Sequence, residues 1–313
     1  MQWAAHEGAN GTLKKSTNRA TLGSMSKLIV VTGGAGFVGS HLCERLIGGG
    51  HRVISLDNYF TGSRENHHEG VEYREGHTKD IAKHITEKPD LIYHLGEYSR
   101  TAVAMEEPDT VWDLNIAGTF GVLEFCRAYK TKVVYAGSST KFAPARENHV
   151  SGRDLSPYTW TKAANSELVR NYARWYEFPY AIAYFYNVYG PRELSGKYGT
   201  VVEIFKQAYL AHESLKVNAP GTQRRIYTHV EDTISALTMI GERGEGDEFG
   251  IASSDEYATI DVAKLFSDTI EMMPHRATSR PGAVVDTTKT RALGWEPKLS
   301  LAGYVEEIKK QHD

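Results

Sequence analysis

The sequence predicts an α/β protein with a doubly wound parallel sheet and a smaller C-terminal lobe. Three observations carry this prediction. Short β-branched runs alternate with longer helical patterns from Lys27 onward, a glycine-rich turn follows the first run, and the alternation loosens after Gly190 and Pro191. Such alternation is typical of βαβ units around a parallel sheet. With 313 residues, 41% of them hydrophobic, the chain is long enough to bury a core of this kind.

The expected elements follow one another between residues 27 and 186. Strands are expected at 27–32, 52–56, 71–74, 90–95, 132–136 and 180–186. Helices are expected between them, at about 38–48, 78–87, 109–129 and 158–176. Residues 1–25 are polar and lack periodicity, so this range is expected to be a tag-like or disordered extension.

Composition favours a small-molecule ligand over a nucleic acid or a membrane. The net charge is -3, and no run of Lys or Arg is longer than a pair. No apolar stretch approaches the roughly 18 residues of a membrane span, and the first residues lack a signal-peptide core. Cys43 and Cys126 lie in apolar, helix-like stretches, which indicates free buried thiols in a reducing compartment. We therefore expect a cytoplasmic protein, and we predict no metal site.

A glycine-rich turn follows the first strand. Gly33, Gly36 and Gly39 fall in the segment VTGGAGFVGSH, between a buried strand and a helix. Glycines at this spacing permit a tight turn and a close approach of the backbone to a pyrophosphate, which free N–H groups at the helix start can bind. Asp57 ends the next strand, about 20 residues further on, as this pattern requires. Its carboxylate would bind the adenosine ribose and repel a 2′-phosphate, so the expected cofactor is NAD rather than NADP.

A tyrosine and a lysine form the second chemical signal. Tyr158 and Lys162 are four residues apart on an expected helix and therefore share one face. A nearby ammonium and a cationic nicotinamide both favour the phenolate, so such a tyrosine can move a proton. Ser139 lies in a turn after the strand at 132–136, where it can donate a hydrogen bond to the same substrate oxygen. An ordinary polar turn is the alternative interpretation of that serine.

Together with further motifs, these residues give a specific resemblance over nearly all of residues 27–309. The motifs include TGGAGFVGSH, Lys79-Asp80-Ile81, His94-Leu95, Asn115-Ile116-Ala117-Gly118-Thr119 and FYNVYGPR. The chain resembles the NAD-dependent epimerase/dehydratase family of extended short-chain dehydrogenases/reductases, and its pattern is most similar to that of nucleotide-sugar 4-epimerases.

The resemblance implies a set of binding residues. The NAD site would contain Gly33, Gly36, Phe37, Val38, Gly39, Asp57, Asn58, Asp80, Ile81, Leu95, Gly96, Asn115, Tyr158 and Lys162. The nucleotide-diphosphate sugar would contact Ser139, Lys141, Tyr158, Asn187, Arg225 and Arg280. An arginine fork suits phosphate oxygens, although a surface ion pair is the plainer interpretation of either arginine.

The resemblance also implies a domain division and an assembly. We expect a Rossmann-type NAD-binding domain formed by residues 26–186 and 224–254. Residues 187–223 and 255–313 would form the substrate-binding lobe. The helices at 109–129 and 158–176 resemble the pair through which relatives form a homodimer, although their apolar residues could instead pack on the protein's own sheet.

Within such a family, the predicted reaction is 4-epimerisation through a transient 4-keto sugar. Ser139, Tyr158 and Lys162 would be the catalytic residues. Relatives that dehydrate carry Asp-Glu after the catalytic serine or threonine, and related decarboxylases carry the glutamate, but Thr140 and Lys141 follow Ser139 here. The first alternative function is a 4-ketosugar reductase or an atypical 4,6-dehydratase. The second alternative is a noncatalytic dinucleotide sensor on the same fold.

The expected substrate pocket departs from the family pattern. Gly96 and Glu97 replace the usual small residues after His94-Leu95, and Tyr184 replaces an arginine. Glu97, Arg100 and Lys141 would put charge near the sugar, which favours a hexose with an acid, amine or other polar substituent. Each of the three could equally form a structural ion pair.

Overall fold

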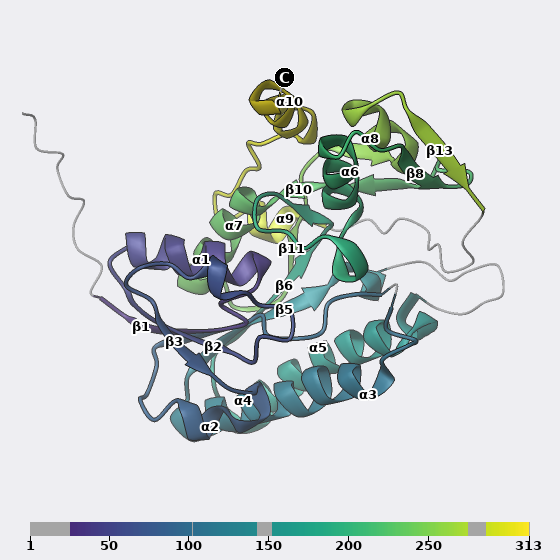
Figure 1. Ribbon diagram of the computed structural model, residues 1–313. Helices are drawn as coiled ribbons and strands as arrows, with labels where there is room; N and C mark the ends of the chain where they lie inside the picture. Colours follow the sequence, from purple (N-terminus) through teal and green to yellow (C-terminus); the bar gives the residue numbers. More distant parts are fainter. Residues whose placement is uncertain (1–25, 102, 143–151, 275–285, 313) are drawn as a thin grey trace, which may run out of the picture.

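A seven-stranded parallel sheet forms the centre of the molecule in the computed structural model, which describes residues 26–101, 103–142, 152–274 and 286–312 (Figure 1). The strand order is β11-β6-β5-β4-β1-β2-β3, and every neighbouring pair is parallel. The strands are β1 (Leu28–Thr32), β2 (Arg52–Asp57), β3 (Glu72–Glu75), β4 (Leu91–His94), β5 (Lys132–Ser138), β6 (Tyr180–Phe185) and β11 (Gly246–Ile251). The predicted doubly wound α/β fold is confirmed.

Helices cover both faces of this sheet. In Figure 1, α1 (Phe37–Gly48) and α7 (Val230–Arg243) lie above it, while α2 (Ile81–His84), α4 (Gly118–Tyr129) and α5 (Pro157–Tyr176) lie below. Side chains alternate between the two faces along a strand. In β1, therefore, Ile29 and Val31 join the apolar cluster under α1 and α7, whereas Val30 joins the cluster against α4 and α5. Cys43 and Cys126 lie in these two clusters as free, buried thiols, as predicted.

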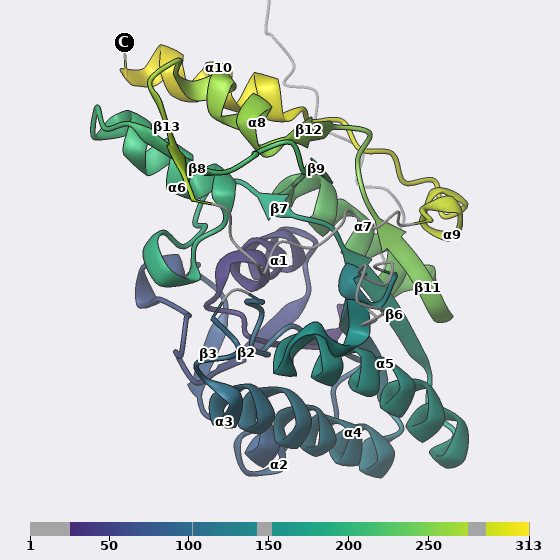
Figure 2. The same cartoon turned by 90° about the vertical axis from the view of Figure 1, so that its right-hand side faces the viewer.

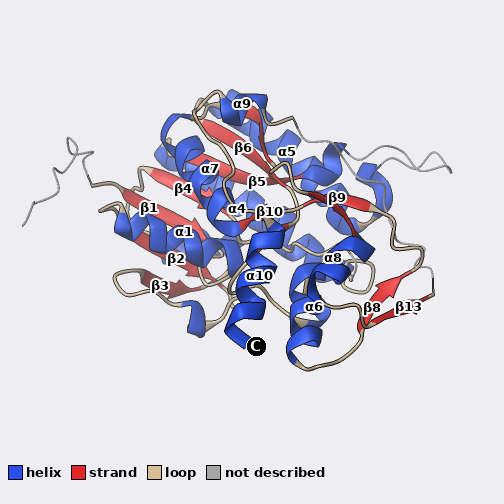
Figure 3. Cartoon of the chain, turned by 90° about the horizontal axis from the view of Figure 1, so that it is seen from above, coloured by secondary structure: helices blue, strands red, loops and turns tan. Residues whose placement is uncertain are grey.

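The smaller lobe has its own apolar cluster, which includes Phe205, Val217 and Phe266. Its helices are α6 (Val201–Leu210), α8 (Thr259–Phe266) and α10 (Leu301–His312). Outside the central sheet the strands form the pairs β8 (Leu215–Asn218) with β13 (Ile270–Met273), β9 (Arg224–Ile226) with β12 (Glu256–Ala258), and β7 (Val188–Tyr189) with β10 (Thr228–His229). Figures 2 and 3 show β8, β13 and α6 at one end of the molecule, apart from the central sheet.

The expected boundary of this lobe stays a prediction. Trp295 falls inside the range expected for the lobe, yet it packs in the cluster under α1 and α7. Its indole N–H donates to the Asp232 carbonyl on α7 (2.9 Å), and the short helix α9 (Thr288–Arg291) precedes it. This part of the C-terminal segment therefore packs on the larger domain.

The observed elements differ from the predicted ones in several places. The six expected strands form, but β11 was not expected, because glycines and acidic residues are uncommon in strands. The helix expected at 78–87 is reduced to α2, since Thr86 and Pro89 are poor helix formers. The helix expected at 109–129 is divided into α3 (Pro108–Val111), a π-helical turn (Trp112–Ala117) and α4.

Short 3₁₀ turns complete the described elements. They occur at Arg64–Asn66, Thr78–Asp80, Ser139–Phe142, Gly152–Leu155 and Gly196–Tyr198. None of the helices within the described ranges combines the length and the apolarity that crossing a bilayer requires. In those ranges, no group of three or more His, Cys, Asp or Glu side chains is arranged to hold a metal ion.

Candidate active site

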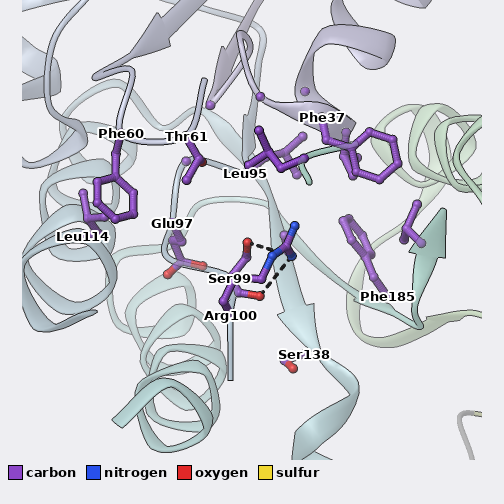
Figure 4. Close-up of a pocket in the computed structure, with 18 of the residues that line it drawn as sticks. Phe37, Phe60, Thr61, Leu95, Glu97, Ser99, Arg100, Leu114, Ser138 and Phe185 are labelled. Carbon is purple, nitrogen blue, oxygen red and sulfur yellow. Dashed lines mark hydrogen bonds between the residues drawn. The ribbon is translucent and has the colours of Figure 1, made fainter. Parts of the chain in front are cut away.

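A cavity of about 350 Å³ lies at the carboxyl ends of the central strands. The turn after β1, the loops after β2 and β4, and the ends of β5 and β6 line it (Figure 4). Between β1 and β4 the order of the strands reverses, and open α/β sheets bind their ligands at such a point. The sequence predicted this position for the site.

The glycine turn fits the pyrophosphate of a dinucleotide. Gly33 has a φ of +72°, which favours glycine, and a Cβ atom on it would lie 2.8 Å from the Gly96 Cα. A Cβ atom on Gly39 would lie 2.0 Å from the Gly33 carbonyl oxygen. Helix α1 begins at Phe37, and no side chain caps its start. The backbone can therefore come close to a phosphate group at the positive end of a helix.

Asp57 lies at the end of β2, at the edge of the same cavity. Its carboxylate accepts hydrogen bonds from the Ala35 amide (2.9 Å) and the Tyr59 amide (2.8 Å), which fix its orientation. Burial raises the pKa of Asp57, and these two amides oppose that rise. The oriented carboxylate fits the role expected at an adenosine ribose.

Helix α5 presents Tyr158 and Lys162 to the cavity. A capping box holds the start of this helix: the Ser156 hydroxyl accepts from the Thr159 amide (3.2 Å), and the Thr159 hydroxyl accepts from the Ser156 amide (2.9 Å). Tyr158 is thereby fixed in the first helical turn. The Lys162 ammonium donates to the Ala136 carbonyl at the end of β5. Both side chains are buried and line the cavity.

The hydroxyl within reach of Tyr158 belongs to Ser138. The Tyr158 hydroxyl donates to the Ser138 Oγ at 3.2 Å. The sequence assigned the hydrogen bond to the substrate oxygen to Ser139, which lines the same cavity. The difference arises because β5 continues to Ser138 instead of ending at Ala136, so Ser138 is the last side chain of the strand. Ser138 is therefore the hydrogen-bond partner of Tyr158 in this structure, and the role of Ser139 at a substrate oxygen stays a prediction.

Glu97 is buried in the wall of the cavity. Its side chain is 2% exposed and forms an ion pair with Lys162. One carboxylate oxygen accepts hydrogen bonds from the Thr119 hydroxyl (2.6 Å), the Asn165 amide (2.9 Å) and the Tyr135 hydroxyl (3.1 Å). Burial is the largest influence on Glu97 and raises its pKa, but the charge of Lys162, the His94 ring and the hydrogen bonds from Lys162 and Thr119 together outweigh it, so the pKa is lowered. Of the two interpretations of Glu97, the ion pair is the one that the structure contains.

A chain of hydrogen bonds connects Glu97 to the glycine turn. The His94 ring lies between the hydroxyl of Thr32 (2.8 Å) and that of Thr119 (3.0 Å), and Thr32 accepts from the Gly96 amide (3.0 Å). Because Thr119 donates to Glu97, the His94 Nε2 carries the proton and the Nδ1 accepts. Burial lowers the pKa of His94 to about 4, so the ring is neutral at pH 7.

Some of the expected site residues lie outside the cavity. Asp80 pairs with Lys83 (2.8 Å), Ile81 is buried in the core, and Asn115 accepts from the Tyr98 amide (2.7 Å). Arg225 lies on β9 and does not line the cavity. The Lys141 side chain and Arg280 fall outside the described residues. The other expected residues do line the cavity: Gly33, Gly36, Phe37, Val38, Gly39, Asp57, Asn58, Leu95, Gly96, Ser139, Tyr158, Lys162 and Asn187.

Arg100 and Glu193 add two ionisable side chains to the cavity lining. The Arg100 guanidinium donates to the carbonyl of Tyr198 and to that of Ser99 (3.3 Å), and burial lowers its pKa. Neither carboxyl oxygen of Glu193 has a hydrogen-bond partner among the described residues. Burial raises the pKa of Glu193 to about 8, although the contact with Thr200 and the charge of Arg100 oppose that rise. No sequence pattern singled out Glu193.

Comparisons with known proteins agree with this geometry. A family model described as the NAD dependent epimerase/dehydratase family matches residues 29–252. The chain is 29% identical over 297 residues to a putative UDP-glucose 4-epimerase of Methanocaldococcus jannaschii, covering 90% of this chain and 97% of that protein. It is 31% identical over 291 residues to UDP-glucuronic acid decarboxylase 2 of Arabidopsis thaliana, covering 87% and 65%. A Thermus thermophilus UDP-glucose 4-epimerase, solved in complex with NAD, is similar with a TM-score of 0.80 at 27% identity, covering 90% of this chain and 99% of that one.

Proposed function

Because the chain belongs to the NAD-dependent epimerase/dehydratase family, we propose that it inverts the configuration at C4 of a nucleotide-activated sugar. Its cofactor is NAD. The observation that carries the proposal is the hydrogen bond between Tyr158 and Ser138, in a cavity that Lys162 and the glycine turn also line. This arrangement provides a proton acceptor, a hydrogen-bond donor and a dinucleotide site in one place.

The cofactor would occupy the part of the cavity between the glycine turn and Asp57. Gly33, Gly36 and Gly39 would bind the pyrophosphate, Asp57 the adenosine ribose, and Lys162 the nicotinamide ribose. NAD supplies the hydride acceptor and donor for chemistry at C4. No net oxidation results when the same hydride returns to C4, so the cofactor should stay bound between turnovers.

The protein's own residues handle the C4 oxygen. Ser138 donates a hydrogen bond to this oxygen, and Tyr158 takes its proton as the C4 carbonyl forms. Lys162 would hold the cationic nicotinamide near Tyr158, which favours the phenolate. After the 4-keto sugar has turned its other face, Tyr158 returns the proton and the inverted alcohol is released. This sequence requires no acid or base beyond Tyr158.

The residues after the serine support epimerisation over elimination or decarboxylation. Ser139 and Thr140 follow Ser138, so both neighbours lack a carboxyl group. Glu97 is held by Lys162 and is therefore a poor candidate for a second base. A 4-ketosugar reductase stays the alternative, because it would use the same Ser138, Tyr158 and Lys162. Its consumption of NADH would distinguish it from an epimerase.

A substrate panel with two matched serine variants tests the proposal. The protein is incubated with UDP-, GDP-, CDP- and dTDP-hexoses, and the products are identified by NMR. We expect a 4-epimer and no accumulation of NADH. Ser138→Ala should lower kcat by about 10- to 1000-fold, as loss of one positioned donor does, whereas Ser139→Ala should retain most activity. Release of CO₂, loss of water, or equal effects of the two serine variants would contradict the proposal.

A further inference from the structure

A buried ion pair lies in the wall of the cofactor cavity. Figure 4 shows Glu97 on the loop after β4, and Lys162 reaches it from α5. The two side chains are 2% and 6% exposed. Three neutral donors, from Thr119, Tyr135 and Asn165, fix the carboxylate at 2.6–3.1 Å. A buried carboxylate with this many partners holds a single position.

The surrounding groups leave this pair electrically neutral. Burial lowers the pKa of His94 on β4 and raises the pKa of Tyr135 on β5, so both are uncharged at pH 7. Thr119 on α4 and Asn165 on α5 carry no charge. In the described ranges no second carboxylate forms an ion pair with Lys162. One positive and one negative charge therefore cancel at this place.

We propose that Glu97 is a positioning residue that fixes Lys162 and cancels its charge. As a result, the site favours oxidised over reduced nicotinamide more strongly than it would if Lys162 had no carboxylate partner. The proposal rests on the placement of Lys162 at the nicotinamide ribose. Oxidised nicotinamide is cationic and the reduced form is neutral, so an uncompensated ammonium nearby weakens the binding of the oxidised form selectively. The carboxylate removes this penalty while Lys162 keeps its N–H donors. An enzyme that begins by taking a hydride benefits from this preference.

Nucleotide titrations of four variants separate a charge effect from a purely structural one. Binding of NAD and of NADH is measured at pH 7 without any sugar, on protein freed of bound nucleotide and checked for folding by circular dichroism. The readout is the ratio of the NAD to the NADH dissociation constant. Glu97→Gln should raise this ratio about tenfold. This is the effect of one uncompensated unit charge at about 8 Å from the nicotinamide, with an effective dielectric constant of about 30. Lys162→Met should lower it, and the double variant, again neutral, should return it towards the wild-type ratio.

Two further variants make the test specific. Glu97→Asp keeps the charge on a shorter side chain, so both nucleotides should bind more weakly while the ratio is preserved. Glu203→Gln is the matched control. The buried Glu203 forms an ion pair with the partly exposed Lys206 (3.2 Å) on α6, outside the cavity, and its loss should leave the ratio unchanged.

Equal weakening of both nucleotides by Glu97→Gln would overturn the inference and leave Glu97 a structural role. A changed ratio in Glu97→Asp would also overturn the inference. Since no sugar is present, neither result bears on the proposed epimerisation.

Discussion

Glu193→Gln should stabilise the protein increasingly as the pH rises. Glu193 is 8% exposed, and burial raises its pKa from an ordinary value of 4.5 to about 8. Between these two values the unfolded chain releases the Glu193 proton while the folded chain retains it, so the folded state loses stability as the pH increases. Each pH unit of that interval costs about 1.4 kcal/mol. The loss is therefore below about 1 kcal/mol at pH 5 and about 3 kcal/mol at pH 7. Glutamine has the same shape and no proton to release.

Urea unfolding at pH 5, 7 and 8.5 measures this difference. The free energy of unfolding of Glu193→Gln, minus that of the wild type, should grow by about 2 to 3 kcal/mol between pH 5 and pH 7. It should level off above pH 8. Glu69→Gln, at an exposed position, is the control and should show no such trend. A difference that is the same at all three pH values would refute the reasoning and would mean that Glu193 is ionised in the folded protein.

Three further predictions concern the cofactor, the proton and the assembly. Tyr158→Phe should lower kcat by about 10²- to 10⁴-fold, because the proton acceptor is lost while the ring remains; unchanged NAD titrations and circular dichroism would show that the fold is intact, and near-normal activity would disprove the assignment. Asp57→Ala should reduce the preference for NAD over NADP in competition binding, since the carboxylate no longer repels a 2′-phosphate; an unaltered preference would argue against its role. The protein should form a homodimer through α4 and α5, where Phe120, Trp160 and Trp175 are exposed by 50%, 38% and 58%. Light scattering at micromolar concentration should give the dimer mass, and Trp175→Glu should give the monomer; a monomeric wild type would contradict this.

Sequence spacing predicted the parts of the site that lie close together in the chain. The glycine turn, Asp57 and the Tyr158–Lys162 pair each depend on one strand end or one helical turn, so local patterns are enough to place them. The sequence did not single out Ser138 as the partner of Tyr158, because the position where a strand ends depends on pairing with its neighbours. For β5, that pairing with β6 continues to Ser138.

The groups that local patterns could not place are those set by tertiary packing. Glu97 and Lys162 are 65 residues apart, and only the fold shows that they form an ion pair. The raised pKa of Glu193 depends on burial, which a sequence without periodicity around that residue does not reveal. Leu123, Phe125 and Val169 looked equally suited to a dimer interface and to the core. In the structure these three residues pack on the protein's own sheet. The dimer prediction therefore rests on the exposed aromatic residues of α4 and α5.

The fate of the hydrogen at C4 tests the proposed reaction most directly. A nucleotide sugar that the panel identifies as a substrate is prepared with deuterium at C4, converted in ordinary water, and examined by NMR and mass spectrometry. Epimerisation through a hydride that leaves and returns to the same carbon predicts a product of inverted C4 configuration with the deuterium still at C4. Deuterium found at another carbon, or lost to the solvent, would contradict a 4-epimerase.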